Sequence, residues 1–207
     1  MNCDRIAPLY EWFENAAFGG RLQAHRVAYL DAASGKQRAL VLGDGDGRFT
    51  EALAARYPAM PIDSIEMSAG MVAQAGKRLS SNSQVRVIQD DVFRVDLAVA
   101  SYDVVFSHFF LDCFEIDLVN RLIQQVSESL VPGGVWVISD FRQGRTGWKR
   151  FYTGAWLRTM YMFFRLVTGL KTSRLPEYRD RLSIAGFSMS REWVSMGGLI
   201  ASELWRH

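Results

Sequence analysis

The residues best suited to chemistry form a short, acidic, glycine-rich loop. The segment "ALVLGDGDGRFTEAL" places Gly43, Gly45 and Gly47 between a strand-like run and a helix-like run. Glycine permits tight turns and lets the backbone approach a ligand closely. In an open α/β sheet, ligands bind in the crevice at the carboxyl ends of the strands. The loop is therefore a candidate ligand site, and a plain strand-to-helix turn is the alternative.

Acidic residues end the next two strand-like runs. Glu66 ends the second run, 19 residues after Gly47. A carboxylate at this place can accept hydrogen bonds from two ribose hydroxyls. Asp90 and Asp91 end the third run, where a carboxylate can accept a hydrogen bond from the amino group of adenine. Each of the first three strands thus ends in a feature suited to an adenosine-containing ligand.

Alternating strand and helix patterns position these residues. Short strand-like runs rich in β-branched residues predict an α/β fold with a parallel sheet covered on both faces. The strand-like runs are 38–42, 62–66, 84–89, 102–107 and 135–140, and helical patterns occupy 48–57, 68–79 and 116–130. Ser68 is a suitable N-cap for the second helix, and "VPGG" at 131–134 predicts a turn.

The pattern changes after Arg142. Residues 147–170 predict a long aromatic helix, and a second helix is expected at about 176–185. Two strand-like runs follow at 186–195 and 198–206, and they predict an antiparallel pair at the sheet edge.

Composition and charge restrict the class of protein. Of the 207 residues, 49% are apolar and 22% are charged, which is typical of a globular domain. No apolar run approaches the roughly 18 residues of a membrane-spanning helix. The first residues carry acids where a signal peptide has positive charge, so we expect a cytoplasmic protein. Two cysteines are too few for a disulfide framework or a cysteine-rich metal site, and we expect no metal.

The charge is divided unevenly along the chain. From Arg142 onward there are 12 basic and 4 acidic residues, whereas the preceding residues carry a net charge of −6. Such a basic segment can face an anionic partner or a membrane surface, and solvated arginines around a helix are the alternative.

Taken together, the motifs resemble those of the class I S-adenosylmethionine-dependent methyltransferases. The loop is G-x-G-x-G rather than the G-x-G-x-x-G of dinucleotide-binding proteins. The resemblance implies a three-layer Rossmann-like fold with a seven-stranded sheet in the order 3-2-1-4-5-7-6, its last strand antiparallel, and a helical lid. The motifs that carry it are "VLGDGDG" (41–47), "IEMSAGMV" (65–72), "QDDV" (89–92), "YDVVFS" (102–107) and "LVPGGVWVISDF" (130–141).

The resemblance also implies a division of the chain. We expect a single methyltransferase domain over 1–207. Within it, residues 1–35 form an amino-terminal helical cover and 36–141 form the cofactor-binding core. Residues 142–175 form a helical lid insertion, and 176–207 form the last helix with the antiparallel strand pair.

The implied cofactor is S-adenosylmethionine, with S-adenosylhomocysteine as its product. Gly43 and Gly45 are expected to pass the backbone under the methionine part of the cofactor, with Gly47 completing the loop. Asp44 or Asp46 is expected to contact the ammonium group. The family's first motif usually has another residue type at the position of Asp44.

The next two motifs imply the contacts to the adenosine part. Glu66 is expected to bind the ribose. Asp91 and the backbone of Val92 are expected to bind the adenine. Asp90 is the less favoured member of the acidic pair. Met67 is expected to pack on the adenine, with ordinary core packing as the alternative.

The end of the fourth strand, "SHFFLDCF", is expected to lie near the transferable methyl group. The resemblance places Ser107 below the sulfonium. His108 is the candidate general base, and a histidine bonded to the backbone and facing away is the alternative. Asp112 can orient that histidine, bind a substrate hydroxyl or cap the next helix. Cys113 is expected to fill space as a small hydrophobe.

The acceptor is expected to be a small apolar or aromatic molecule, such as a quinone or a phenol. Trp148, Tyr152 and Trp156 recur at helical spacing in the predicted lid, and Phe109 and Tyr10 are expected to join them around the substrate. Packing in the core is the alternative for this aromatic stripe. The lid segment loosely resembles that of the C-methyltransferases of ubiquinone and menaquinone synthesis.

Other functions remain as alternatives. A nucleic-acid partner is not expected, because the Asn/Asp-Pro-Pro-aromatic motif of base amino methyltransferases is absent and no RNA-binding module is visible. A methyltransferase acting on phospholipids or another membrane-surface acceptor is one alternative, with 147–170 as a peripheral membrane contact. A non-catalytic module that binds the cofactor or a partner is the other. The sequence does not indicate the oligomeric state.

Overall fold

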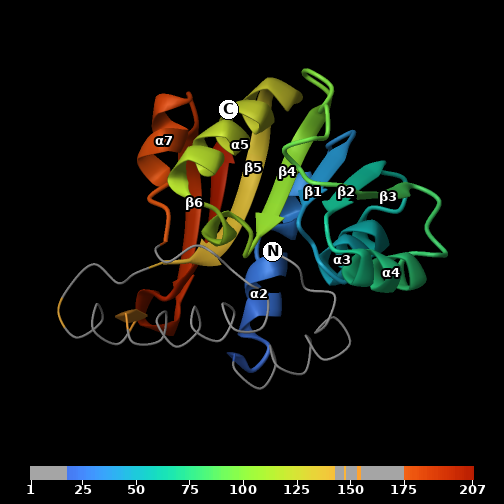
Figure 1. Ribbon diagram of the computed structural model, residues 1–207, viewed down its shortest axis with the longest axis horizontal. Helices are drawn as coiled ribbons and strands as arrows, with labels where there is room; N and C mark the ends of the chain where they lie inside the picture. The colour runs from blue at the N-terminus through green and yellow to red at the C-terminus, as the bar shows by residue number, and fades with distance from the viewer. Residues whose placement is uncertain (1–17, 143–146, 148–152, 155–174) are drawn as a thin grey trace.

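A seven-stranded sheet forms the centre of the molecule (Figure 1). The computed structural model describes residues 18–142, 147, 153–154 and 175–207. The strands are β1 (Ala39–Leu42), β2 (Ile62–Glu66), β3 (Val85–Gln89), β4 (Tyr102–His108), β5 (Leu130–Phe141), β6 (Ser188–Ser195) and β7 (Ile200–Arg206). Their order is β3-β2-β1-β4-β5-β7-β6, and β7 runs antiparallel to both of its neighbours. The expected α/β fold and strand order are confirmed.

Helices lie before and between the strands. They are α2 (Arg21–Val27), α3 (Arg48–Arg56), α4 (Ala69–Arg78), α5 (Ile116–Ser129) and α7 (Arg179–Ile184), with 3₁₀ turns η1 (Leu30–Ala33), η2 (Leu111–Cys113) and η3 (Met196–Gly198). The predicted N-cap of α4 is confirmed, because the Ser68 hydroxyl accepts a hydrogen bond from the backbone N–H of Met71 at 3.3 Å. The helices expected at 48–57, 68–79, 116–130 and 176–185 correspond to α3, α4, α5 and α7.

The sheet is buried on both faces because its central strands are apolar on both sides. On one face, Leu42, Val105 and Trp136 pack against α5 and α7. On the other face, Val41 and Phe106 pack against Phe49 and Leu53 of α3 and against η1. These residues are almost completely buried, and each large apolar side chain contributes about 1.5–3 kcal/mol by leaving water.

The segment "VPGG" differs from the expected simple turn. It lies at the start of β5, where the pairing of β4 with β5 jumps from Tyr102 opposite Leu130 to Val104 opposite Val135. Gly133 has a φ of 74° within this irregular stretch. The extra residues form a bulge, so the strand begins earlier than the sequence pattern predicts.

An ionic cluster around the buried Asp63 lies at the amino-terminal edge of the sheet. The carboxylate of Asp63 accepts hydrogen bonds from Arg38 Nη2 and Arg86 Nε, both at 2.7 Å, and from the Tyr102 hydroxyl at 2.9 Å. Burial raises the pKa of Asp63, but these bonds outweigh burial and hold the pKa below its ordinary value. The cluster joins β2, β3 and β4 at the edge opposite the glycine loop.

The carboxyl ends of the strands face α2. Figure 1 shows α2 below the tips of the central strands, on the same edge as the glycine loop. Phe18 and Leu22 pack there against Phe141, Leu199 and Ile200 from the ends of β5 and β7. The predicted cover residues 1–17 and most of the predicted helix 147–170 lie outside the described residues. Within the described part of the chain, no helix is long and apolar enough to cross a membrane.

Candidate active site at the carboxyl ends of the strands

The glycine loop has the backbone conformation that requires glycine. Gly43, Gly45 and Gly47 have φ values of 66°, 66° and 83°, in the left-handed region that other residues rarely adopt. The loop leaves β1 beside β2, and the Gly43 N–H donates to the Ile65 carbonyl at 2.9 Å. The strand–turn–helix context that a ligand loop needs is therefore present.

The three glycines have different surroundings. A Cβ atom at Gly43 would lie 2.2 Å from the Phe110 ring, and one at Gly47 would lie 3.0 Å from Ala75. A Cβ at Gly45 would meet only the Met71 sulfur, at 3.8 Å, among the described atoms. Gly43 and Gly47 are thus required by close packing, whereas Gly45 has space beside it for a ligand.

The two aspartates of the loop have separate roles. The Asp44 carboxylate accepts hydrogen bonds from the backbone N–H groups of Phe49 (3.2 Å) and Thr50 (2.7 Å) at the start of α3. Burial raises the pKa of Asp44 to about 6. Asp46 is instead paired with the guanidinium groups of Arg48 (3.0 Å) and Arg78 (3.4 Å). Asp44 is therefore the better placed of the two to receive a ligand ammonium group.

Glu66 links the ends of β1 and β2. One carboxylate oxygen accepts from the Gly45 N–H at 3.1 Å, and the other accepts from the Ser68 N–H at 2.8 Å. Burial raises the pKa of Glu66, and these backbone bonds oppose that effect. Each oxygen keeps a second lone pair, so the carboxylate can still accept hydrogen bonds from two ribose hydroxyls.

The end of β3 and the residue after Glu66 surround the predicted adenine position. Asp90 is exposed, and one oxygen of its carboxylate accepts from the Asp91 N–H at 2.7 Å. Asp91 is partly buried and accepts from the Phe93 N–H at 3.0 Å, and Val92 is buried. Met67 is 46% exposed, so it does not belong to the core. An exposed methionine beside this loop is suited to packing on a flat ring.

Ser107 lies beneath the surface of the site. Its side chain is fully buried, and its hydroxyl accepts a hydrogen bond from the Trp136 indole N–H at 2.9 Å. This bond joins β4 to β5 under the position expected for the sulfonium. Because the Ser107 hydroxyl is buried and already bonded to Trp136, we interpret its role as holding β4 against β5 rather than contacting a ligand.

His108 is buried against aromatic rings. It is only 5% exposed, and its ring stands edge-on to Phe49 at a centroid distance of 4.4 Å. Burial lowers the pKa of His108 well below its usual value, and the charge of Arg26 acts in the same direction. Neither ring nitrogen has a hydrogen-bond partner in the structure described. Among the described contacts, His108 therefore does not form the hydrogen bond to the backbone that the alternative interpretation expects.

Asp112 pairs with an acid that the sequence analysis did not select. Asp140, at the end of β5, accepts hydrogen bonds from the backbone N–H groups of Asp112 (3.2 Å) and Phe141 (2.8 Å). Burial raises the pKa of Asp112 to about 6, and burial together with the neighbouring Asp112 raises the pKa of Asp140 well above its usual value. The charge of each carboxyl group therefore influences the protonation of the other.

The geometry narrows the roles expected for Asp112. Glu115 is the N-cap residue of α5, so Asp112 does not cap that helix. No described hydrogen bond joins Asp112 to His108, so the structure does not show the expected orienting contact. Cys113 is only half-buried, and its thiol contacts the Phe109 carbonyl at 3.8 Å. The signal for Asp140 is its position as the one acid of "VWVISD", at the end of a buried strand.

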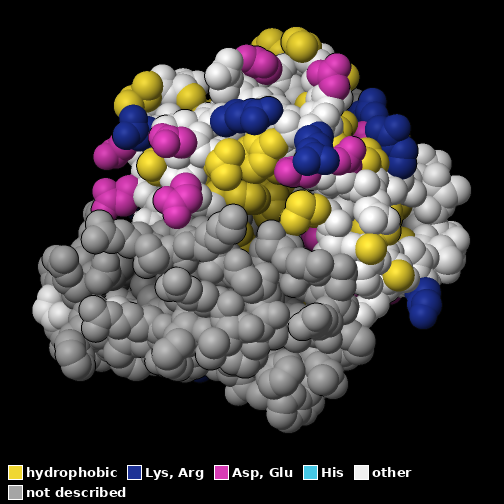
Figure 2. Space-filling view, viewed as in Figure 1, with side chains coloured by type: hydrophobic (Ala, Val, Ile, Leu, Met, Phe, Trp, Pro, Cys, Tyr) yellow, Lys and Arg dark blue, Asp and Glu magenta, His cyan; other side chains and the backbone are white. Residues whose placement is uncertain are grey.

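Aromatic side chains follow β4. Phe109 has a φ of 54°, an uncommon conformation for a residue other than glycine, and its ring lies 5.1 Å from that of Phe141. Phe110 and Phe114 are in edge contact at 4.9 Å. Figure 2 shows hydrophobic side chains gathered in the middle of one face, over α5 and the loop after β4. The predicted pocket residues Tyr10, Trp148, Tyr152 and Trp156 lie outside the described residues.

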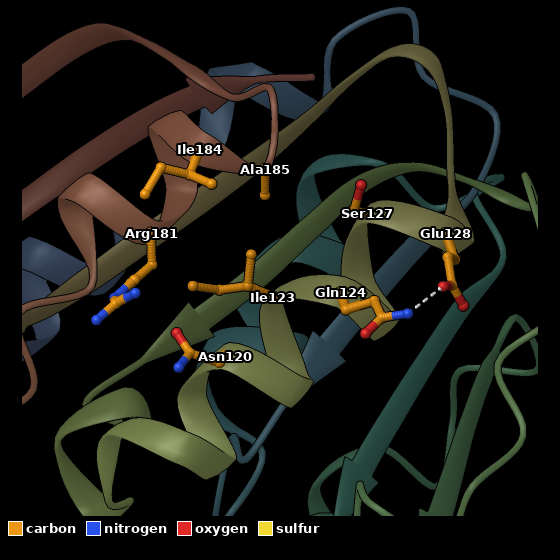
Figure 3. A pocket seen from close by; sticks show the side chains of 8 residues that line it. All are labelled: Asn120, Ile123, Gln124, Ser127, Glu128, Arg181, Ile184 and Ala185. Atoms are coloured by element: carbon orange, nitrogen blue, oxygen red, sulfur yellow. Dashed lines mark hydrogen bonds between the residues drawn. The ribbon is translucent and has the colours of Figure 1, made fainter.

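A separate groove runs between α5 and α7 (Figure 3). It has a volume of about 440 Å³ and is lined by residues including Asn120, Ile123, Arg181 and Ile184. Gln124 is bonded to Glu128 along its floor at 2.9 Å. The groove contains none of the predicted cofactor-binding residues, so it is not the candidate active site. Among the described residues, no cluster of acids, histidines or cysteines is arranged to hold a metal ion.

Comparison with known proteins connects this geometry to a family. Residues 39–134 match the family model described as a methyltransferase domain. The chain is 28% identical over 130 residues to a malonyl-[acyl-carrier protein] O-methyltransferase of Halalkalibacterium halodurans, covering 58% of this chain and 47% of that protein. The match thus spans about half the length of that relative.

Two further proteins match more of the chain. A carboxy-S-adenosyl-L-methionine synthase of Pseudomonas fluorescens is 26% identical over 188 residues, covering 77% of this chain and 74% of that protein. The solved structure of an S-adenosylmethionine-dependent methyltransferase from Mesorhizobium loti superimposes with a TM-score of 0.67, at 19% identity. That match covers 90% of this chain and all of the other. It shows that the fold is shared.

Proposed function

We propose that the chain, of which residues 39–134 match a methyltransferase domain, is a class I S-adenosylmethionine-dependent methyltransferase that methylates a small apolar or aromatic acceptor. The observation that carries the proposal is the set of binding features on three neighbouring strand ends. Gly45 leaves open space after β1, Glu66 presents its carboxylate after β2, and Asp91 follows β3. Their order along the sheet edge matches the methionine, ribose and adenine parts of one extended molecule.

The residues of this site are suited to holding two reactants in line. S-adenosylmethionine supplies a methyl group that its positive sulfur has already activated. Alignment of the acceptor with that methyl group can lower the barrier by about 7–11 kcal/mol in favourable cases. Glu66 and the glycine loop would fix the donor, and the residues after β4 would position the acceptor.

A base is required only if the acceptor must lose a proton. His108 is neutral near pH 7, because burial lowers its pKa, so it can accept a proton only weakly. The Asp112–Asp140 pair is the other group near the end of β4 that can exchange a proton, because the pKa of Asp112 is raised to about 6. His108 or the Asp112–Asp140 pair could serve as the base for a phenol-like acceptor, which must lose a proton. An acceptor that is methylated on carbon would depend less on such a base.

The aromatic residues after β4 support an apolar acceptor. Phe109, Phe110 and Phe114 are each partly buried and lie in the loop after β4, where Phe110 contacts Phe114 and Phe109 contacts Phe141. Aromatic walls of this kind favour flat, apolar ligands.

A second candidate is synthesis of a carboxylated form of the cofactor. The relatives named carboxy-S-adenosyl-L-methionine synthase match about three quarters of this chain, more than the O-methyltransferase relative does. In this case the product is a modified cofactor, and no methylated acceptor is formed.

One labelling experiment tests the proposal against this alternative. Cell extract is incubated with the protein and S-adenosylmethionine that carries a deuterated methyl group, and the products are examined by mass spectrometry. We expect the deuteromethyl group in a small molecule that partitions into organic solvent. Label only in macromolecules would contradict the acceptor class. A cofactor that has gained a carboxyl group would favour the second candidate.

A further inference from the structure

The chain leaves the sheet at the end of β4, close to the glycine loop. The last register pair of β4 and β5 joins His108 to Ser139, and the two strands lie side by side (Figure 1). The Phe109 N–H then donates to the Ser139 carbonyl at 2.6 Å, and Phe109 has a left-handed backbone. This conformation is unfavourable for a bulky residue and persists only where the surroundings determine it. Contacts from other elements therefore hold the loop after β4 in place.

Asp140 supplies such a contact from the end of β5. Its side chain is almost completely buried. One carboxylate oxygen accepts from the N–H of the next residue, Phe141, and the other accepts from the Asp112 N–H at 3.2 Å. Asp112 lies in the 3₁₀ turn η2, and the first N–H groups of such a turn have no acceptor within the turn itself. Asp140 thus joins η2 to the sheet.

The residue before this turn, Phe110, lies against the glycine loop. Phe110 is the N-cap residue of η2, so the position of its ring depends on the position of the turn. A Cβ atom added to Gly43 would overlap the Phe110 ring, which therefore fills the space beside the first glycine of the loop. The ring is also in edge contact with Phe114. A continuous series of contacts thus runs from Asp140 through η2 and Phe110 to Gly43.

We propose that Asp140 is a positioning residue for the glycine loop, on which it acts through η2 and Phe110. Without its hydrogen bonds to the backbone, the turn and the ring would have more freedom. Binding of a ligand on the loop would then have to order them, at a cost in affinity. The inference rests on the proposed function, which assigns this loop to the methionine part of S-adenosylmethionine. It does not depend on whether the Asp112–Asp140 pair exchanges a proton.

Calorimetry with S-adenosylhomocysteine measures the effect on the loop. Asp140→Ala should weaken binding about three- to tenfold, as expected when a ligand must immobilise one or two further side chains. Phe110→Leu removes the ring and should weaken binding by a similar factor. Because both changes act on the same contact, the double variant should bind within about twofold of the weaker single variant. If the two factors multiply instead, Asp140 does not act through Phe110 and the inference is wrong.

Two further variants separate positioning from a general loss of stability. Asp63→Ala also removes a buried aspartate that accepts hydrogen bonds, but at the opposite edge of the same sheet. It should lower the midpoint of urea denaturation and leave the affinity unchanged. An equal loss of affinity in Asp63→Ala and Asp140→Ala would overturn the inference. Asp140→Asn keeps one acceptor oxygen, should bind more tightly than Asp140→Ala, and serves as the test if the alanine variant does not fold, as judged by circular dichroism.

Fluorine NMR tests the positioning step without any ligand. A para-fluorophenylalanine incorporated only in place of Phe110 reports the surroundings of that ring. Asp140→Ala should shift or broaden its signal, whereas Asp63→Ala should leave it unchanged. A signal that is the same in Asp140→Ala and in the wild type would contradict the inference. If the wild-type protein does not bind S-adenosylhomocysteine, the proposed function fails, and the fluorine signal alone decides whether Asp140 positions Phe110 on the glycine loop.

Discussion

Binding of S-adenosylhomocysteine is expected to weaken as the pH falls, because of Asp44. In the protein without ligand, burial raises the pKa of this carboxyl group to about 6. An ammonium group beside Asp44 in the complex favours its charged form. In the complex, Asp44 therefore stays charged until the pH is much lower. In the free protein, protonation of Asp44 competes with binding of the ligand.

The size of the effect follows from this pKa. At about pH 7, roughly one tenth of the free protein carries a proton on Asp44, and at about pH 5 roughly nine tenths does. If only the charged form binds, the apparent affinity falls about tenfold between these values, which corresponds to about 1.4 kcal/mol. Affinity is fully present above the pKa of the free protein and is lost as the pH falls through it.

Isothermal titration calorimetry at a series of pH values measures this dependence directly. Asp44→Asn is the matched control, because asparagine removes the charge and still offers one oxygen to the Thr50 N–H, although the Phe49 N–H then loses its own acceptor. The variant should bind more weakly near neutral pH and show a flatter profile than the wild type. Burial also raises the pKa of Glu66, so a smaller residual dependence of the same sign is expected.

Two results would refute this reasoning. Affinity of the wild-type protein that stays constant between about pH 7 and about pH 5 would show that no carboxyl group with a raised pKa faces the ligand. A profile for Asp44→Asn as steep as that of the wild type would assign the dependence to another group. Circular dichroism at each pH confirms that the protein remains folded.

Further predictions concern stability and the support of the site. Gly47→Ala forces a left-handed backbone and brings a Cβ within 3.0 Å of Ala75, so urea denaturation should show a loss of about 1–3 kcal/mol. Asp63→Asn should cost about 1–3 kcal/mol near neutral pH. The pKa of Asp63 is lower in the folded than in the unfolded protein, so its contribution to stability is present above the unfolded-state pKa. The contribution is lost as the pH falls through the folded-state pKa. The free energies of unfolding of the variant and the wild type should therefore become equal in acid. Trp136→Phe removes the donor to the buried Ser107 hydroxyl, and thermal unfolding should report a loss of about 1–3 kcal/mol with little change in cofactor affinity.

The sheet could be predicted from the sequence because its signals are local. Each strand-like run is short, contains β-branched residues and is followed by a turn or an acid, and the helix α4 begins at a recognisable boundary, Ser68. The strand order was implied by the resemblance of the motifs and is confirmed by the pairing. The bulge at "VPGG" was missed, because the register of β4 against β5 depends on both strands.

The candidate site was only partly predictable, because partners distant in sequence decide it. Nothing local distinguishes Asp44 from Asp46, but Arg78 lies on α4 and pairs with the second of them. Likewise, the pairing of Asp112 with Asp140 joins residues 28 positions apart.

The most direct test of the account is a crystal structure with S-adenosylhomocysteine bound. We predict that the ligand lies along the carboxyl ends of β1, β2 and β3, with its ribose hydroxyls on Glu66, its adenine beside Asp91 and its amino-acid part over Gly45. A ligand found elsewhere, such as in the groove between α5 and α7, would contradict this account. So would a protein that remains without ligand when crystallised at a saturating concentration.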